Sequence, residues 1–421
     1  MKGNKPVFVD LFAGCGGLSL GMEQAGFVPI MVSELNHDAM ETYLVNREQE
    51  FEYIRKYSFA NVKDLVNNDS TREKIIHGIK RDLKIDMNNG ELDLLIGGPP
   101  CQGYSGIGHR RSYSVNKDQI PSNHLYDDMA FLIEKFQPRV FIFENVRGLL
   151  TSKWTDSGEK GEIWKDVLKR FKSIENYSVK WDLIHAYEYG VPQNRPRVIM
   201  VGIHDRVGYT IPTKDDSAKK AGLLPVGSNA YPDIKDLIGD LVDPDYLTNR
   251  VTNEYLSDPL SDIQYELRCN HRTGEVLGKG DTLFEQVYSK HHEIVRAKFQ
   301  YMLDNHGQIP YDMKTNKFAQ RVLPAQWMDQ KPSITTTSLP DDYVHYLQPR
   351  ILTVREWARS QTFPDWYKFS GKRTTGGTRR AGIPSMGFHE REVPKYTQIG
   401  NAVPVRLAKE IGVHIYKLIM R

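Results

Sequence analysis

The chain has 421 residues, of which 39% are hydrophobic and 26% are charged, and its formal net charge is +3. This length favours two domains, and the composition is typical of a globular protein rather than a disordered one. No apolar stretch approaches the ~20 residues that span a bilayer, so we expect no membrane partner and a cytoplasmic location. Because the net charge is small, any binding to nucleic acid has to come from local clusters of Lys and Arg.

The spacing of cysteine and histidine indicates neither a disulfide framework nor a metal site. Cys15, Cys101 and Cys269 are odd in number and far apart, which favours a reduced, intracellular chain with free thiols. The Cys-x-His sequence at 269–271 and the adjacent histidines at 291–292 lack the remaining ligands of a zinc site. We therefore expect no bound metal.

Short apolar runs alternate with amphipathic segments over residues 7–203. In chain order, the strands predicted from these runs are "VFVDLF", "VPIMVSE", "LDLLIGG" and "RVFIFEN", and helices are predicted over 18–25, 38–47 and 125–136. This alternation predicts a parallel sheet with helices on both faces. The later runs "YSVKWDLIHA" and "RPRVIMVGI" are separated only by "YEYGVPQN". Such a short connection favours an antiparallel hairpin, so the sheet is predicted to be mixed.

The pattern changes after residue 205. Residues 206–320 combine Tyr, His, Arg and Lys with little periodicity, apart from a helix predicted over 293–303, and α/β signals return afterwards. We therefore predict a first domain over 1–205, an inserted second domain over 206–320, and a return to the first domain over 321–421. The final helix, "VRLAKEIGVHIYKLI", is predicted to pack near the first strand.

A glycine-rich turn follows the first predicted strand. "VDLFAGCGG" places glycines at 14, 16 and 17, where the backbone can approach a ligand closely and a helix N-terminus offers free amides. Glu34 ends the second strand, where an acidic side chain commonly accepts hydrogen bonds from ribose hydroxyls. Ser19 stands where the dinucleotide fingerprint requires its third glycine. These residues alone fit any adenosine-bearing cofactor, and a purely structural turn is the alternative.

Polar clusters lie at the ends of neighbouring predicted strands. Cys101 follows "LDLLIGG", Glu144 and Asn145 end "RVFIFEN", and "QNRPR" at 193–197 lies at the hairpin. Singly, each has an ordinary structural interpretation, namely a buried thiol, a strand cap or a surface salt bridge. Because open α/β sheets bind ligands at one edge, the joint placement of these residues favours a site.

A thiol, a carboxyl group and an arginine beside a ribose pocket suit methylation of a pyrimidine ring carbon. C5 of the ring is a poor nucleophile, but addition of a thiolate to C6 gives C5 carbanion character. A carboxyl group at N3 supports the charge that develops, and an arginine can hold O2. An ordinary thiol gives only a few per cent thiolate at neutral pH, so positive neighbours should assist Cys101. The base has to swing out of a duplex for this attack.

In the same order along the chain, several motifs resemble those of cytosine-C5 DNA methyltransferases of the bacterial restriction-modification type. They are "DLFAGCGG", "GGPPCQGYS", "FENV", "VPQNRPRV", "RILTVREWARSQTFPD" and "YTQIGNAVPV". The resemblance covers nearly the whole chain except about 206–320, which corresponds to the variable target-recognition region of the family. It implies a Rossmann-like S-adenosylmethionine-dependent methyltransferase fold, with a mixed sheet, helices on both faces and a smaller inserted target-recognition domain.

The resemblance also implies roles for individual residues. Cys101 is the implied nucleophile, Glu144 contacts N3 and the exocyclic amine, and Arg197 stabilises the base at O2. The implied substrate-binding residues are Gln102, Asn145, Gln193 and Arg195. The implied residues of the S-adenosylmethionine site are Phe12, Ala13, Gly14, Cys15, Gly16, Gly17, Glu34, Leu35, Asn61, Val62, Pro100, Asn401 and Ala402. Asn61 stands where the family usually has Asp.

By this resemblance the chain is expected to be a monomeric DNA (cytosine-5-)-methyltransferase that acts on a specific short sequence in double-stranded DNA and is paired with a restriction endonuclease. An NAD-dependent oxidoreductase would use the glycine turn and Glu34 but would leave Cys101 and Glu144 without a shared role. A catalytically silent DNA-binding protein would not need these two residues. An amino-methyltransferase carries an aromatic residue where Cys101 stands. Methylation of tRNA by the same mechanism is the nearest alternative, and the large insert favours duplex DNA.

Overall fold

The computed structural model describes residues 5–100, 124–155, 157–314, 320–337, 339–376, 379 and 392–420. The chain forms two compact units. The first consists of Met1–His185, Pro196–Gly227 and Leu407–Arg421, and the second of Ala186–Arg195 and Ser228–Arg406. The chain therefore passes between the two units at 185/186, 195/196, 227/228 and 406/407. The domain limits 1–205, 206–320 and 321–421 were assigned by function, and they stay a prediction.

The first unit is built on a mixed sheet. Within the described residues the strand order is β3-β2-β1-β4-β5-β7-β6. The strands are β1 (Val7–Leu11), β2 (Val28–Ser33), β3 (Ser58–Phe59), β4 (Leu94–Gly97), β5 (Val140–Val146), β6 (Tyr177–His185) and β7 (Pro196–His204). Strands β3, β2, β1, β4 and β5 pair in parallel, whereas β7 is antiparallel to both β5 and β6. The predicted mixed sheet and hairpin are confirmed.

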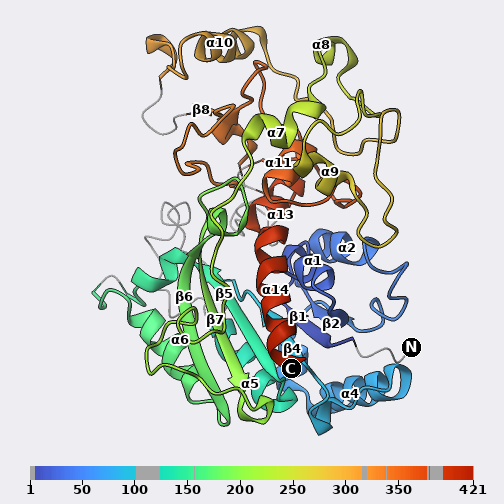
Figure 1. Cartoon of the computed structure of the whole chain (residues 1–421), viewed down its shortest axis with the longest axis vertical. Helices are drawn as coiled ribbons and strands as arrows, with labels where there is room; N and C mark the ends of the chain where they lie inside the picture. The colour runs from blue at the N-terminus through green and yellow to red at the C-terminus, as the bar shows by residue number, and fades with distance from the viewer. Residues whose placement is uncertain are drawn as a thin grey trace. The chain divides into compact units, whose positions relative to one another are not determined.

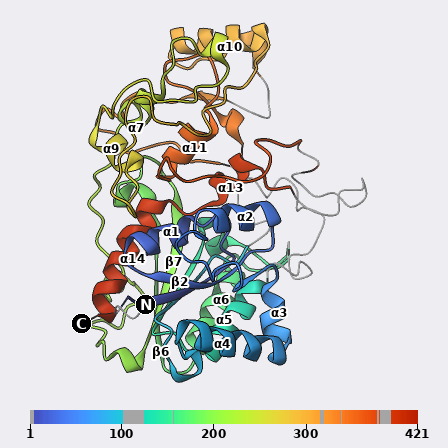
Figure 2. The ribbon, with the colours of Figure 1, turned by 90° about the vertical axis from the view of Figure 1, so that its right-hand side faces the viewer.

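Helices cover both faces of this sheet (Figures 1 and 2). They are α1 (Gly17–Gln24), α2 (His37–Val45), α3 (Val62–Asn67), α4 (Asp69–Leu83), α5 (Leu125–Phe136), α6 (Glu162–Lys172) and, from Leu407 onward, α14 (Val405–Ile419). Buried apolar side chains of α3 to α6 form one core with the strands. Figure 2 shows α3 to α6 on one side of the strands and α1 and α14 on the other.

Helix α5 shows how the sequence determines one of these elements. Its buried residues Met129, Ile133 and Phe136 recur at helical spacing and face the sheet. Two acidic residues lie in its first turn and Lys135 in its last, which suits the helix dipole. The helix ends at Gln137, which adopts a left-handed backbone conformation with φ 45°.

Helix α14 packs against α1 through very small residues. A Cβ atom added at Gly21 would lie 2.3 Å from Ala408 Cβ, and one added at Gly412 would lie 2.8 Å from Ala25 Cβ. The ring of Tyr416 meets Phe27 edge-on at 5.9 Å between centroids. The C-terminal helix is therefore seated on the helix that follows β1.

We expect Gly21→Val to destabilise the protein by about 1–3 kcal/mol, because the new side chain has to push α14 away from α1. Urea denaturation of the variant and the wild type measures this difference. Gly376→Ala is the control, since in the described part of the chain a Cβ atom there meets nothing within 4 Å beyond its chain neighbours. Equal midpoints for the Gly21 variant and the control would contradict the expected steric conflict.

The second unit consists of short elements. They are α7 (Ile234–Ile238), α8 (Tyr246–Asn249), α9 (Asp262–Arg268), α10 (Glu293–Asp304), β8 (Arg321–Val322), β9 (Tyr343–Val344), α11 (Val354–Ser360) and α13 (Lys395–Asn401). Strands β8 and β9 pair in parallel. The helix predicted over 293–303 corresponds to α10.

Buried charges hold part of this second unit together. Arg359 on α11 lies 2.5 Å from Asp240 Oδ1 and 2.6 Å from Asp365 Oδ2, with all three side chains inaccessible to solvent. Arg268, at the end of α9, also forms an ion pair with Asp240, with 2.5 Å between Nη2 and Oδ2. Loss of one partner from such a network leaves a buried charge uncompensated, so these ion pairs link α9 and α11 to the turn that follows α7.

Across the described part of the chain, no helix combines the length and apolar character needed to cross a membrane.

Candidate functional site

The topology of the first unit brings three chain segments to one edge of the sheet. Leu11 of β1 is paired with Gly97 of β4, and Gly97 with Phe143 of β5, all in parallel. The segments that follow these three residues therefore emerge side by side. The chain also reverses its direction of strand addition between β1 and β4, which is where open α/β sheets have their ligand crevice.

The turn after β1 has an unusual backbone. Phe12, Gly14 and Gly16 have φ angles of 62°, 56° and 83°, in the left-handed region. A bulky residue such as Phe rarely adopts that region, and its presence is typical of functional sites. The turn is held by hydrogen bonds from Ala13 N to Ser33 O and from Gly16 N to Ala13 O, both 3.0 Å.

Glu34 connects this turn to the end of β2. Its Oε2 accepts from Gly14 N and its Oε1 from Asn36 N, each at 2.8 Å. Burial raises the pKa of Glu34 above its ordinary value, and the backbone amides that it accepts from oppose this rise. The backbone amide of Leu35 is a third such donor, and a carboxylate has about four lone-pair positions, so one stays available to a ribose hydroxyl.

The space around the turn fits a ligand. Among the described residues, a Cβ atom at Gly14 would meet no atom within 4 Å apart from its chain neighbours, and the neighbouring Leu35 side chain is 74% exposed. An open backbone, a carboxylate and an exposed apolar side chain are the features that an adenosine-bearing molecule needs. The residues present therefore fit such a cofactor.

The other predicted cofactor residues differ in their surroundings. Asn61 is exposed and caps α3, its Oδ1 accepting from Lys63 N at 3.0 Å. Val62 is buried in the core. Pro100 is exposed. Asn401 and Ala402 end α13 and belong to the second unit.

Cys15 and Gly17 complete the turn. The thiol of Cys15 is buried, and burial raises its pKa to about 12, so it stays protonated at neutral pH. Gly17 is the first residue of α1 and is also buried.

At the end of β5, Glu144 forms an ion pair with Arg197. Arg197 Nε lies 2.6 Å from Glu144 Oε1, and Arg197 Nη1 donates to Pro196 O at 2.8 Å. The antiparallel register places Arg197 opposite Val146, two residues beyond Glu144. Arg197 is only 7% exposed, and this burial lowers its pKa, while the charge of Glu144 opposes the decrease. The predicted carboxyl group and arginine thus lie in contact.

The segment after β4 is fitted closely to Glu144. A Cβ atom at Gly98 would lie 2.9 Å from Glu144 Oε2, so the absence of a side chain makes room for the carboxylate. Asn145 is buried, and its Nδ2 donates to Pro99 O at 3.0 Å. The chain is therefore fixed just before residue 101. Cys101 and Gln102 themselves lie outside the described residues.

Gln193 and Arg195 belong to the second unit, although Arg197 belongs to the first. Gln193 is inaccessible to solvent, and its Nε2 donates to Ser360 O at 2.7 Å. Arg195 donates from Nη1 to Thr336 O at 2.7 Å and from Nη2 to Gly400 O at 2.6 Å. These contacts secure the 186–195 segment, and the predicted substrate-binding role of both residues stays a prediction.

A buried acid inside β1 is part of the site's surroundings and was not predicted. Asp10 accepts from Ser19 Oγ at 2.5 Å, and Ser19 Oγ lies 3.1 Å from Tyr43 Oη. Burial raises the pKa of Asp10 to about 7, while the Ser19 hydroxyl and the charge of Arg47 act in the opposite direction. The available signal was an acid in the otherwise apolar run "VFVDLF", because such an acid needs a partner.

We expect the stability conferred by Asp10 to depend on pH. The folded protein retains a proton on Asp10 up to about pH 7, whereas the unfolded chain releases it near the ordinary value of 3.8. Between these values the folded state binds more protons, so its stability falls as pH rises, by about 1.4 kcal/mol per pH unit. Asp10→Asn removes this contribution.

Urea denaturation at about pH 5, 6 and 7 checks this expectation. The free energy of unfolding of the wild type, minus that of Asp10→Asn, should decrease steadily across the series. A difference that is constant with pH would show that Asp10 titrates alike in both states.

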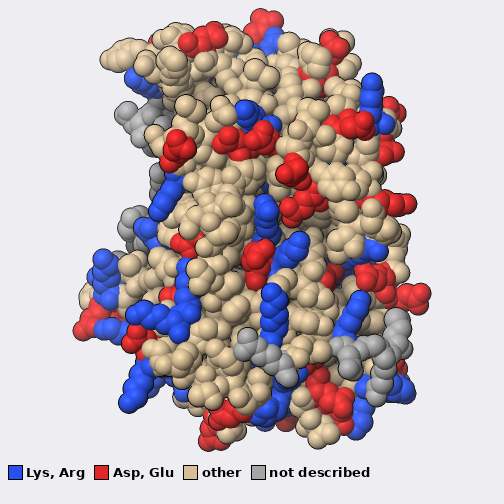
Figure 3. Space-filling model, in the orientation of Figure 1, with Lys and Arg blue, Asp and Glu red and all other residues tan. Residues whose placement is uncertain are grey.

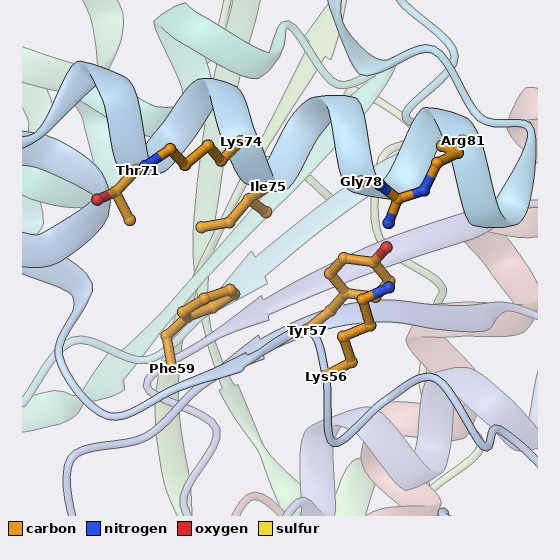
Figure 4. A pocket seen from close by; sticks show the side chains of 8 residues that line it. All are labelled: Lys56, Tyr57, Phe59, Thr71, Lys74, Ile75, Gly78 and Arg81. Atoms are coloured by element: carbon orange, nitrogen blue, oxygen red, sulfur yellow. The ribbon is translucent and has the colours of Figure 1, made fainter.

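A separate shallow pocket of about 250 Å³ opens between α4 and the segment that leads into β3 (Figure 4). It is lined by Lys56, Tyr57, Phe59, Thr71, Lys74, Ile75, Gly78 and Arg81. None of these is a predicted site residue. Lys56 and Arg81 share one acidic partner, Asp82, at 2.5 and 2.8 Å.

The chain is similar to known proteins over nearly its whole length. Residues 7–417 match a family model described as C-5 cytosine-specific DNA methylase. The chain is 29% identical over 426 residues to the type II methyltransferase M.DdeI of Desulfomicrobium norvegicum, covering 97% of this chain and 88% of the relative. It is also 29% identical over 422 residues to the type II methyltransferase M.BsuRI of Bacillus subtilis, covering 96% and 78%.

A solved structure shares the fold. It is described as a DNA modification methyltransferase encoded within an E. coli prophage, and it superposes with a TM-score of 0.66 at 23% identity. The match covers 99% of this chain and 100% of that one.

Proposed function

Since the matching model spans residues 7–417, the chain belongs to the C-5 cytosine-specific DNA methylase family and is a DNA (cytosine-5-)-methyltransferase, and we propose that it methylates C5 of a cytosine flipped out of a specific duplex sequence. The observation that supports this most directly is the ion pair between Glu144 and Arg197 at the end of β5. It lies against Gly98, three residues before Cys101.

In this proposal Cys101 adds through its sulfur to C6 of the cytosine. The C5–C6 double bond opens and its electrons move to C5, which bonds to the methyl carbon, and the bond from that carbon to the sulfonium sulfur of S-adenosylmethionine would break to leave S-adenosylhomocysteine. The proton on C5 is afterwards lost to a base, and the electrons of that C–H bond restore the double bond and expel the Cys101 thiolate. The enzyme is thereby regenerated with one methyl group on the ring.

Glu144 and Arg197 have complementary tasks at the ring. Glu144 contacts N3 and the exocyclic amine, where its carboxyl group stabilises the charge that develops during thiolate attack. Arg197 holds O2 with a guanidinium that carries charge at any neutral pH. Because the ion pair already fixes both groups, little reorganisation is needed when the base arrives.

S-adenosylmethionine fits the glycine turn, and when bound it supplies an electrophilic methyl group. Gly14 and its neighbours leave the backbone open to the cofactor, and Glu34 is placed to accept from the ribose hydroxyls. Leu35 offers an exposed apolar surface for the adenine. Asn61 keeps one oxygen lone pair for the adenine amine after capping α3.

The substrate is proposed to be double-stranded DNA in the bacterial cytoplasm. On the face in view in Figure 3, Lys and Arg are interspersed with Asp and Glu, in keeping with the net charge of +3. Contacts to phosphates therefore have to come from local clusters. Because the relatives carry type II methyltransferase names, we further propose that methylation protects DNA from a cognate restriction endonuclease.

The test is bisulfite sequencing of DNA from cells that express the protein. We expect protected cytosines within one short sequence, and none in cells that express Cys101→Ser. Bisulfite sequencing of RNA from the same cells tests the tRNA alternative. Protected cytosines in tRNA, together with unmodified DNA, would mean that the substrate is tRNA. Complete conversion in both nucleic acids, with the purified protein still folded, would refute the proposal.

A further inference from the structure

The side chain of Arg47 is fully buried next to the glycine turn, and it bonds in three directions. Its Nη2 donates to Gly16 O at 3.1 Å, and its Nη1 donates to Tyr43 O at 2.9 Å. Its Nε lies 2.6 Å from Glu23 Oε1 at the other end of α1. One guanidinium thus joins the first turn of α1, the last turn of α1 and helix α2.

Burial of the ion pair between Arg47 and Glu23 has a large desolvation cost. The two side chains are 0% and 4% exposed, so both charges have lost their hydration. Apolar residues of similar volume often replace such a pair without loss of stability. Stability alone therefore does not account for the pair. The group that Arg47 holds in place is the Gly16 carbonyl.

Gly16 occupies a decisive position in the turn. It precedes α1, has a φ angle of 83°, and has no side chain that could cap the helix. Its carbonyl accepts from Leu20 N at 2.9 Å as well as from Arg47. Because a trans peptide is planar, its C=O and N–H groups point in opposite directions. Fixing the Gly16 carbonyl therefore aims the Gly17 amide away from Arg47.

Further contacts fix the orientation of Arg47 itself. Its guanidinium lies 3.8 Å from the centroid of the Tyr43 ring. The Tyr43 hydroxyl reaches Ser19 Oγ, which donates to Asp10 in β1. Arg47 is thus held on one side by Glu23 and on the other by a chain of polar groups that begins in β1.

We propose that Arg47 is a positioning residue for cofactor binding: through the Gly16 carbonyl, it directs the first amides of α1 towards the carboxylate of S-adenosylmethionine. Arg47 does not touch the cofactor in this account. The first amides of a helix have no partner within the helix, and they favour a negative group. The inference rests on the proposed function, in which the glycine turn is the cofactor site.

The experiment compares three variants with the wild type. Glu23→Leu combined with Arg47→Met removes the ion pair and fills its space with apolar side chains. Arg47→Lys retains a charge for Glu23, but a single ammonium cannot also reach both carbonyl oxygens. Arg55→Met is the matched control, because Arg55 pairs with Glu41 at the surface and is 47% exposed.

Calorimetric titration with S-adenosylhomocysteine and steady-state kinetics are the measurements. We expect the double variant and Arg47→Lys to bind about tenfold more weakly, the effect of one lost charged hydrogen bond. The KM for S-adenosylmethionine should rise by the same factor, while kcat at saturating cofactor and the KM for DNA stay unchanged. Arg55→Met should equal the wild type.

The outcomes separate this inference from the proposed function. If the wild type does not bind S-adenosylhomocysteine, the proposed function fails. If the wild type binds and both Arg47 variants bind equally well, the role of Arg47 is refuted. A fall in kcat with unchanged KM also refutes it. If the double variant melts lower, the rise in Tm caused by S-adenosylhomocysteine reports its affinity, and a rise equal to that of the wild type again refutes the role.

Discussion

Cys101→Ser is expected to abolish methyl transfer while leaving the affinity for S-adenosylhomocysteine within about twofold of the wild type. A serine hydroxyl is far less ionised and less nucleophilic than a thiol at neutral pH, so addition to C6 stops. The cofactor residues of the glycine turn are not altered by this change. Incorporation of a labelled methyl group into DNA and calorimetric titration measure the two properties.

Cys269→Ser is the matched control, because Cys269 lies in the second unit and has no assigned role. It should retain full activity. An oligonucleotide with 5-fluorocytosine in its target should form a stable adduct with the wild type and none with Cys101→Ser, as read by mass spectrometry. Substantial methylation by Cys101→Ser would remove the covalent mechanism.

Glu144→Gln is expected to lower kcat by about 10²–10⁴-fold, since a neutral amide can neither exchange the N3 proton nor balance the developing charge. The same change leaves the buried Arg197 without its ionic partner, which should cost about 3–5 kcal/mol of stability. Activity and the free energy of unfolding therefore both fall in the single variant. Single-turnover methylation and urea denaturation record them.

A double variant separates the two effects. Glu144→Gln combined with Arg197→Gln removes both buried charges, so most of the lost stability should return. Methyl transfer should not return, because the ring then lacks both its carboxyl and its guanidinium contact. Recovery of activity together with stability would mean that Glu144 acts only through folding.

Most strands of the first unit could be predicted because their sequences are apolar runs, whereas the two-residue strand β3 was not predicted. β5 and β7 coincide closely with "RVFIFEN" and "RPRVIMVGI", and the short connection before β7 indicated the antiparallel pair. Helices α4 and α6 were not identified. Their polar faces are extensive, and their buried residues become evident only when their spacing is examined, as with Ile75, Ile76 and Ile79 in α4.

The short helices of the second unit could not be predicted from periodicity. α7, α8 and α9 have between four and seven residues, so hydrophobic spacing cannot repeat often enough to be recognised. Their arrangement depends instead on ion pairs between distant residues, such as Arg359 and Asp240. Pairs of this kind leave no local pattern in a sequence.

For the candidate site, the proximity of Glu144 and Arg197 followed from their positions at strand ends. The sequence did not indicate that Arg195 belongs to the second unit and Arg197 to the first, since both lie in one five-residue motif. The contacts of Arg47 with Gly16 and Glu23 join residues 31 and 24 positions apart, so only the folded chain reveals them.

The path of the chain limits how the second unit can be exchanged between relatives. The backbone passes from one unit to the other at 185/186, 195/196, 227/228 and 406/407. A chimera made by grafting only 228–406 from another enzyme would leave the host's 186–195 in place. Gln193 and Arg195 of the host would then meet foreign counterparts of Ser360, Thr336 and Gly400. Working hybrids should therefore need both segments from the same donor.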